Sequence, residues 1–198
     1  MKKNLKILSL LLCFTMVFAM LTACGKKDSE NVVVMSVEGY GDITIELYPK
    51  YAPETVENFK KLVSEGFYDG TVFHRVVEGF MIQGGGYTAE NTDTPKKADT
   101  IFGEFSSNGY KNNTLSHTRG VISMARTNMP NSASSQFFIM HEDSDFLDGN
   151  YAAFGEVIDG MEVVDKIATC QVTANPAMPG EISVPVKYPV ITSVTFKK

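Results

Sequence analysis

The stretch FHRVVEGFMIQGG, residues 73–85, places one permanent cation in largely apolar surroundings with little acid nearby. Arg75 is followed by Phe80 and Met81, and Gln83 precedes a run of glycines. Arginine stays charged and projects its donors in a rigid plane, which suits electrostatic stabilisation. Taken one at a time, such an arginine is usually a solvated surface residue, and such apolar side chains usually belong to a core. Only a joint pattern can favour a site.

Other kinds of catalytic machinery are not visible in the sequence. The three histidines, His74, His117 and His141, lie far apart and lack the spacing of metal ligands. The GGGY segment at 84–87 lacks the Lys-Ser/Thr pair of a phosphate-binding loop, and no serine lies in a nucleophile-elbow motif. We therefore expect no metal and no cofactor, and a reaction that needs no nucleophile.

Three long stretches, in this order along the chain, resemble the cyclophilin family of peptidyl-prolyl cis/trans isomerases. They are FHRVVEGFMIQGG (73–85), GVISMARTNMPNSASSQFFI (120–139) and FLDGNYAAFG (146–155). The similarity extends to GDITIELYPKYAPETVENF (41–59) and covers residues 32–198. It implies a mainly β fold, a closed eight-stranded antiparallel β-barrel capped by two α-helices.

The resemblance also implies roles for individual residues. Arg75 matches the catalytic arginine, and Gln83 matches the side chain that bonds the substrate backbone. The remaining matches form the substrate site: Phe80, Met81, Phe138 and Leu147 hold the proline ring, Ala125 and Arg126 lie along the peptide backbone, Gln136 lies at the rim, and Phe146 and Tyr151 close the far side.

The implied reaction explains the apolar neighbourhood of the cation. An amide resists rotation with a barrier of about 18–20 kcal/mol because its nitrogen lone pair is delocalised. A twisted amide loses this delocalisation, and its nitrogen becomes pyramidal and basic. A guanidinium that bonds this nitrogen stabilises the twisted form over both planar forms. Apolar walls hold the proline ring and exclude water.

The sequence departs from the best-known family members at two of these positions. Phe146 stands where they carry tryptophan, and Tyr151 stands where they carry histidine. Loss of the indole N–H predicts weak binding of the cyclic peptide inhibitor cyclosporin, and a nanomolar affinity measured by titration would contradict this. The segment MARTNMPNSASSQFF, residues 124–138, resembles the bacterial form of the family.

Periodic segments supply the elements that must position these residues. Strands are predicted at 32–37, 42–48, 71–77, 80–84, 120–125, 135–140, 152–158 and 188–198, and helices at 52–67 and 160–168. Residues 84–119 are predicted to form a long loop, which in a compact domain is usually functional or a covering flap. Short strands with two helices favour a closed antiparallel barrel, since closure removes exposed edges.

The N-terminus predicts export. MKKNLK is a cationic segment, an apolar run follows, and LTAC at 21–24 resembles a bacterial lipobox. We expect residues 1–23 to be a signal peptide, and Cys24 to be lipidated and joined to the domain by a short tether, 24–31. A retained membrane anchor and plain secretion are the alternatives. Either lipidation or a retained anchor would hold the protein at the membrane, outside the cytoplasm.

Composition restricts the partners. Residues 1–23 carry three lysines and no acid, so their removal leaves 15 basic and 23 acidic residues, a net charge of -8. This balance, without a basic stripe, disfavours nucleic acid. We expect a monomer that acts on proline-containing segments of unfolded or exported proteins and assists their folding. The alternatives are a module or chaperone that binds proline peptides without turnover, and a solute-binding lipoprotein, for which one domain is small.

Overall fold

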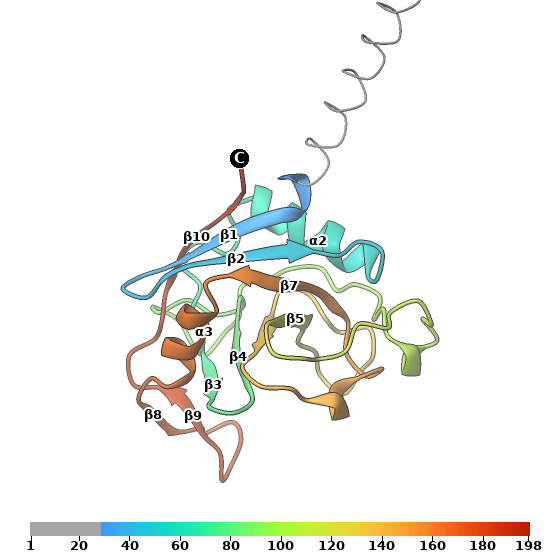
Figure 1. Cartoon of the computed structure of the whole chain (residues 1–198). Coiled ribbons are helices and arrows are strands. Elements are labelled where there is room, and N and C mark those ends of the chain that lie inside the picture. The colour runs from blue at the N-terminus through green and yellow to red at the C-terminus, as the bar shows by residue number, and fades with distance from the viewer. Residues whose placement is uncertain (1–28) are drawn as a thin grey trace, which may run out of the picture.

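The computed structural model describes residues 29–198, which form a curled antiparallel sheet with two helices packed on it (Figure 1). The strands of the sheet follow the order β10-β1-β2-β7-β5-β6-β4-β3. Their bounds are β1 Val32–Val37, β2 Gly41–Leu47, β3 Arg75–Val77, β4 Met81–Gly84, β5 Val121–Met124, β6 Phe137–Met140, β7 Ala153–Asp159 and β10 Ile191–Phe196. The predicted mainly β fold with eight antiparallel strands is confirmed.

The other elements lie outside this sheet. Helix α2 (Pro53–Ser64) packs against β10, and α3 (Met161–Ala168) packs against β2, β3 and β4. A separate hairpin pairs β8 (Val172–Ala174) with β9 (Ile182–Pro185). Short 3-10 helices are η1 (Ser29–Asn31), η2 (Ser106–Asn108) and η3 (Asp145–Leu147). Within residues 29–198, no helix is long and apolar enough to cross a membrane. The predicted signal peptide and Cys24 lie outside the described residues.

Closure of the barrel is less complete than predicted. The predicted strand at 71–77 starts only at Arg75, and no regular ladder joins the edge strands β3 and β10 in the described chain. Instead, main-chain bonds link residues 70–73 to 189–191, for example from the Ile191 N–H to the Thr71 oxygen at 2.7 Å. The sheet is therefore strongly curled, with an irregular seam between its edges.

Strand β6 explains how one sheet builds both a core and a site. Side chains alternate across a strand, so Phe137 and Ile139 enter the main core inside the curled sheet. Phe138 and Met140 point the other way and join a second apolar cluster with Met81 on β4. All four residues of β6 are buried. The continuous apolar sequence FFIM is therefore a strand covered on both faces.

The register of strands β3, β4, β6 and β5 places four side chains in one row across the sheet, which we call the functional row. Arg75 on β3 lies opposite Gln83 on β4, and Gln83 lies opposite Phe138 on β6. Phe138 in turn lies opposite Ser123 on β5. Directly opposed residues share one face of an antiparallel sheet. Four polar and aromatic side chains are thus placed side by side on the face that carries the second cluster.

Helix α2 begins with a cap from far along the chain. Its N-cap residue, Ala52, has no side-chain acceptor. The buried carboxylate of Glu104 instead accepts hydrogen bonds from the Glu54 and Thr55 N–H groups at 3.1 and 2.8 Å, and from the Thr55 hydroxyl at 2.7 Å. An anion at this position also complements the helix dipole. Glu104 thereby fixes part of the predicted long loop to the barrel.

Candidate active site

A cavity of about 480 Å³ opens on the face that carries the functional row. Its lining includes most of the residues predicted from the sequence, namely Arg75, Phe80, Met81, Gln83, Ala125, Arg126, Gln136, Phe138, Leu147 and Tyr151. These residues come from β3, β4 and β6, from the segment after β5, and from the segment that contains η3. The fold therefore gathers side chains that lie up to 76 positions apart in the sequence.

The floor of the cavity is apolar and rigidly supported. Met81, Phe138 and Leu147 are buried within the second cluster and line the cavity together. The Tyr151 ring meets Phe138 edge to face, with centroids 5.7 Å apart. A hollow of this kind can take a small apolar ring without rearrangement.

Arg75 is paired with an acid that the sequence did not reveal. Its Nε and Nη2 atoms donate to the two carboxylate oxygens of Glu181, each at 2.8 Å. The prediction that the Arg75 guanidinium has no acidic partner is therefore wrong. Its partner stands 106 positions further along the chain, just before β9. The Arg75 guanidinium holds the pKa of the Glu181 carboxyl at about 2, helped by hydrogen bonds from Ser183 and Asn175.

The third nitrogen of Arg75 stays on the cavity side. Nη1 lies 3.5 Å from the Gln83 Oε1 and 3.8 Å from the Met81 sulfur, which are long contacts. The Gln83 amide in turn donates to Gln136 Oε1 at 3.1 Å. A row of donors and acceptors therefore runs along one wall, next to the apolar floor.

A buried polar network supports the floor from behind. The His117 ring is stacked 6.0 Å from Phe138, with Nδ1 2.8 Å from Asp148 Oδ1 and Nε2 3.0 Å from Ser123 Oγ. Burial lowers the pKa of His117, so the ring is neutral near pH 7. The order Ser-His-Asp matches a hydrolase triad, but the Ser123 side chain is fully buried and cannot meet a substrate. The network orients Phe138.

Comparison with known proteins identifies the family of this chain. The sequence model of the cyclophilin type peptidyl-prolyl cis-trans isomerase family matches residues 32–195. The chain belongs to the cyclophilin family. A peptidyl-prolyl cis-trans isomerase of Acinetobacter baylyi is 48% identical over 143 residues, which cover 70% of this chain and 72% of that protein. Isomerase B of Escherichia coli is 46% identical over 140 residues, covering 65% and 79%.

Solved cyclophilins share the fold. A cyclophilin from Cryptosporidium parvum, crystallised in the presence of the dipeptide Ala-Pro, superposes with a TM-score of 0.67 at 28% identity, covering 84% of this chain and 99% of that one. A cyclophilin from Hirschia baltica gives a TM-score of 0.62 at 29% identity, covering 85% and 74%. The predicted family is confirmed, and the enzyme is a peptidyl-prolyl cis-trans isomerase.

One predicted site residue of this cyclophilin lies outside the cavity. Phe146 is 67% exposed and does not line the hollow. Its ring stacks on Phe80 with centroids 5.7 Å apart, so it extends the rim outward. The prediction that Phe146 closes the far side is therefore wrong, because η3 turns Leu147 inward and Phe146 outward.

Arg126 is occupied by the protein itself. Its guanidinium donates to the Asn150 carbonyl at 2.7 and 3.0 Å and lies between two rings, 4.9 Å from the Phe105 centroid and 4.6 Å from that of Tyr151. The group holds the segment after η3 against the loop after β5. Its position lines the cavity, while most of its donors are already used.

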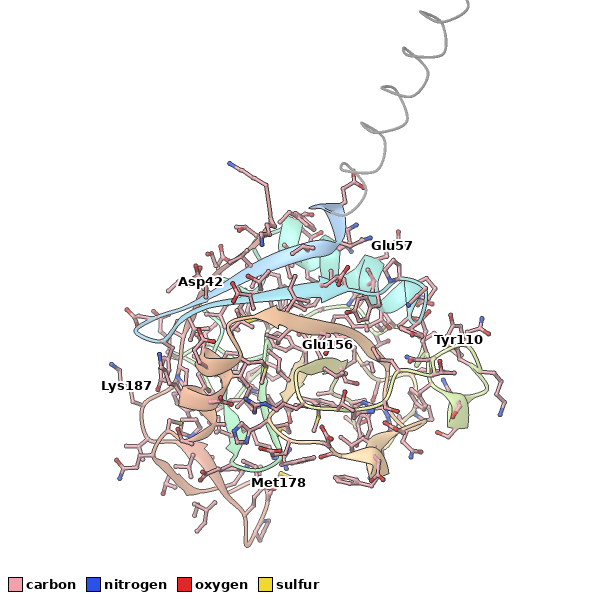
Figure 2. All side chains as sticks on the ribbon, viewed as in Figure 1. Asp42, Glu57, Tyr110, Glu156, Met178 and Lys187 are labelled. Carbon is pink, nitrogen blue, oxygen red and sulfur yellow. The ribbon has the colours of Figure 1, made fainter. Side chains whose placement is uncertain are left out.

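The hairpin of β8 and β9 supplies a wall that sequence reasoning missed. The turn between these strands lines the cavity with four residues, Asn175, Pro176, Ala177 and Met178. Figure 2 labels Met178 at the lower edge of the molecule, on this turn. The proline- and glycine-rich run NPAMPG at 175–180 was a turn signal between two short apolar runs, and it could have revealed the hairpin.

The described residues contain no cluster of side chains suited to bind a metal ion. Within residues 29–198, no group of three or more His, Cys, Asp or Glu side chains could hold a metal ion. His74 lines the cavity beside Arg75, and burial lowers its pKa to about 4. His74 is thus neutral near pH 7 and packs edge-on against Tyr87, with centroids 4.6 Å apart.

Proposed function

We propose that this cyclophilin twists Xaa-Pro bonds by holding the proline ring on the apolar floor while the Arg75 Nη1 edge bonds the amide nitrogen. One observation carries the proposal: the guanidinium edge that Glu181 leaves free lies beside Met81 and Gln83, at the wall of the cavity. The Ala-Pro dipeptide named with the Cryptosporidium parvum relative supports a proline ligand.

The twisted amide is the species that this site would stabilise. Planar cis and trans amides delocalise the nitrogen lone pair, so neither offers it to a donor. The lone pair becomes an acceptor only as the bond rotates. A donor that bonds it then lowers the barrier without binding the ground state more tightly. Because water is excluded by Met81, Phe138 and Leu147, this hydrogen bond is stronger than it would be in solvent.

Gln83 has a supporting role in this proposal. Its side chain is bonded to Gln136 and lies opposite Arg75 in the β3–β4 register. A substrate backbone laid along the segment at Ala125 would meet this amide and be steadied while the preceding carbonyl swings. Positioning of this kind contributes to rate by keeping the reacting groups aligned.

The test is a protease-coupled isomerisation assay on a proline-containing peptide. We expect wild-type enzyme to accelerate isomerisation and Arg75→Ala to lose about 10²–10³-fold in kcat/KM, as when a single transition-state donor is removed. Lys187→Ala is the control, since Lys187 is exposed, does not line the cavity and lies at the left edge of the molecule in Figure 2. Equal rates for wild type and Arg75→Ala would refute the role of Arg75. If the wild-type protein does not accelerate isomerisation either, the alternative that it binds proline peptides without turnover would stand.

We propose further that the enzyme acts outside the cytoplasm, tethered by a lipidated Cys24, on exported proteins with slow proline steps. The cationic start, apolar run and LTAC segment support this setting. Two acyl chains on one cysteine are enough for stable anchoring. Proline isomerisation takes about 10–100 s without catalysis, so unfolded chains arriving there would benefit.

Fatty-acid labelling of cells tests the anchor. Wild-type protein should carry the label and sediment with membranes, and Cys24→Ser should lose the label and the processing before residue 24. Unlabelled wild type in the medium would indicate plain secretion, and unlabelled wild type in membranes a retained anchor. Size-exclusion chromatography of the domain tests the expected monomer.

A further inference from the structure

The Arg75–Glu181 pair is unusually well placed for a surface ion pair. The two side chains are only 18% and 26% exposed, and the contact is bidentate, with both distances at 2.8 Å. Arginine and carboxylate bonded in this fork geometry fix the plane of the guanidinium as well as its place. A single contact would leave that plane free to rotate.

Glu181 is itself held by the hairpin that carries it. Its N–H donates to the Met178 carbonyl at 3.0 Å, and its carbonyl accepts from the Asn175 N–H at 2.8 Å. The Asn175 amide also donates to Ser183 Oγ at 2.9 Å, which ties the two ends of the turn together. Strand β9 packs against β3, beside which it lies in Figure 1. The carboxylate therefore approaches Arg75 from an ordered element.

The pairing decides which donors remain for a substrate. Glu181 accepts from the Nε hydrogen and from one Nη2 hydrogen. The second Nη2 hydrogen and the two on Nη1 remain, and Nη1 lies beside Met81 and Gln83. The Phe80 ring lies on the face of the guanidinium, 5.9 Å from Cζ. Few other contacts would keep the plane in this orientation if Glu181 were removed.

We propose that Glu181 is a positioning residue for the isomerase reaction, which clamps the Nε–Nη2 edge of Arg75 so that Nη1 faces the bound prolyl amide. This inference rests on the proposed role of Arg75. It assigns a function to the β8–β9 hairpin, which lies outside the barrel. It also predicts that the clamp affects turnover more than binding, because the amide nitrogen accepts a hydrogen bond only when twisted.

Two substitutions test the clamp. Glu181→Gln keeps the size of the side chain and removes the charge and one acceptor. Glu181→Asp keeps the charge and draws the carboxylate back by one methylene. We expect both to lower kcat by about tenfold, less than the roughly 10²-fold that an ångström of misplacement can cost. The affinity for a non-reacting proline peptide, measured by calorimetry, should change by less than twofold. Glu162→Gln, at an exposed position of α3, is the matched control.

A double-mutant cycle with Arg75→Ala shows whether Glu181 acts through Arg75. In the Arg75→Ala background, Glu181→Gln should have no further effect on kcat, since coupled residues are not additive. The Arg75 Nε–H resonance gives a second readout that does not depend on turnover. It should be protected from exchange in wild type and exchange faster in Glu181→Gln.

The outcomes separate this inference from the proposed function. Unchanged or increased kcat in both Glu181 variants, with Arg75→Ala still inactive, overturns the clamp and leaves the role of Arg75 standing. An additive loss in the double mutant also overturns it. An active Arg75→Ala enzyme overturns the proposed function itself. If Glu181→Gln lowers thermal stability, the Nε–H exchange is measured in Glu181→Asp instead. Exchange faster than in wild type supports the clamp, and unchanged exchange overturns it.

Discussion

Arg75 presents one edge of its guanidinium group to the cavity, because Glu181 takes the other two nitrogens. The same residue type on an open strand would be hydrated and mobile, with no fixed direction for its donors. Three features change this in the described structure: the ion pair, the Phe80 ring and the apolar floor. The charged side chain thus becomes directional through nearby residues of the β3–β4 hairpin, Phe80 and Met81, together with Glu181, which is 106 positions away.

The network behind Phe138 is open to a direct test at the level of one atom. Ser123→Ala removes the Oγ that lies 3.0 Å from His117 Nε2 and leaves a buried ring nitrogen without a partner. We expect the free energy of unfolding to fall by about 1–3 kcal/mol, the cost of an unsatisfied buried polar group. Urea denaturation measures it, with the exposed Ser64→Ala as control. The kcat should also fall, because His117 then supports Phe138 less firmly.

At the level of elements, the periodicity of apolar residues predicted the helices and strands whose burial pattern is set by local sequence. In the β1–β2 hairpin, Ile43, Ile45 and Leu47 are buried as their alternation predicts. Helix α2 buries Val56, Phe59, Leu62 and Val63, which recur at helical spacing. Here the burial pattern is repeated within a few residues, so a short window contains the information.

The elements that depend on distant partners were not predicted. The β8–β9 hairpin has short strands in which only two of seven residues are buried, so its alternation is weak. Neither the ion pair of Glu181 with Arg75 nor the cap of Glu104 on α2 is visible locally, because the partners are 106 and about 50 positions apart. The family resemblance predicted ten of the twenty residues that line the cavity, while these two acids were found only in the folded structure.

The cap on α2 gives a prediction at this level. Glu104→Gln leaves one carbonyl oxygen for three donors and removes the anion at the helix N-terminus. We expect the free energy of unfolding to fall by about 1–2 kcal/mol, as for the loss of a helix N-cap. Urea denaturation would measure this change. Glu57→Gln, on the exposed face of the same helix in Figure 2, should change it by less than 0.5 kcal/mol or so.

On the scale of the whole molecule, stability rests on the apolar core, with little help from covalent links. Cys170 is a free, half-buried thiol in the described chain. The main core fills the inside of the curled sheet, while the second cluster lies on its outer face under the cavity. The site is therefore built on a supported surface of the barrel. The seam, where residues 70–73 bond to residues 189–191, lies next to it, since the adjoining residues His74 and Tyr188 line the cavity.

Two buried histidines make the stability of the folded state depend on pH. Burial lowers the pKa of His74 from 6.5 to about 4, and it also lowers the pKa of His117. Below pH 6.5 the unfolded chain binds protons at these positions while the folded chain does not. Their contribution is therefore fully present above pH 6.5 and is lost as the pH falls toward the folded pKa values. Each such histidine lowers the free energy of unfolding by about 1.4 kcal/mol for each unit by which the pH falls within that window.

Urea denaturation of the domain at intervals from pH 8 to pH 4.5 measures this dependence. The free energy of unfolding should be flat with respect to these histidines above pH 7 and decline between pH 6.5 and 4.5. Glu181 acts in a separate window. Its pKa is lowered to about 2, so its pair with Arg75 is fully stabilising above about pH 4.5 and is lost only as the pH falls toward 2. A stability that stays constant from pH 7 to 4.5 would mean that both rings are already protonated, or equally accessible to protons, in the folded enzyme.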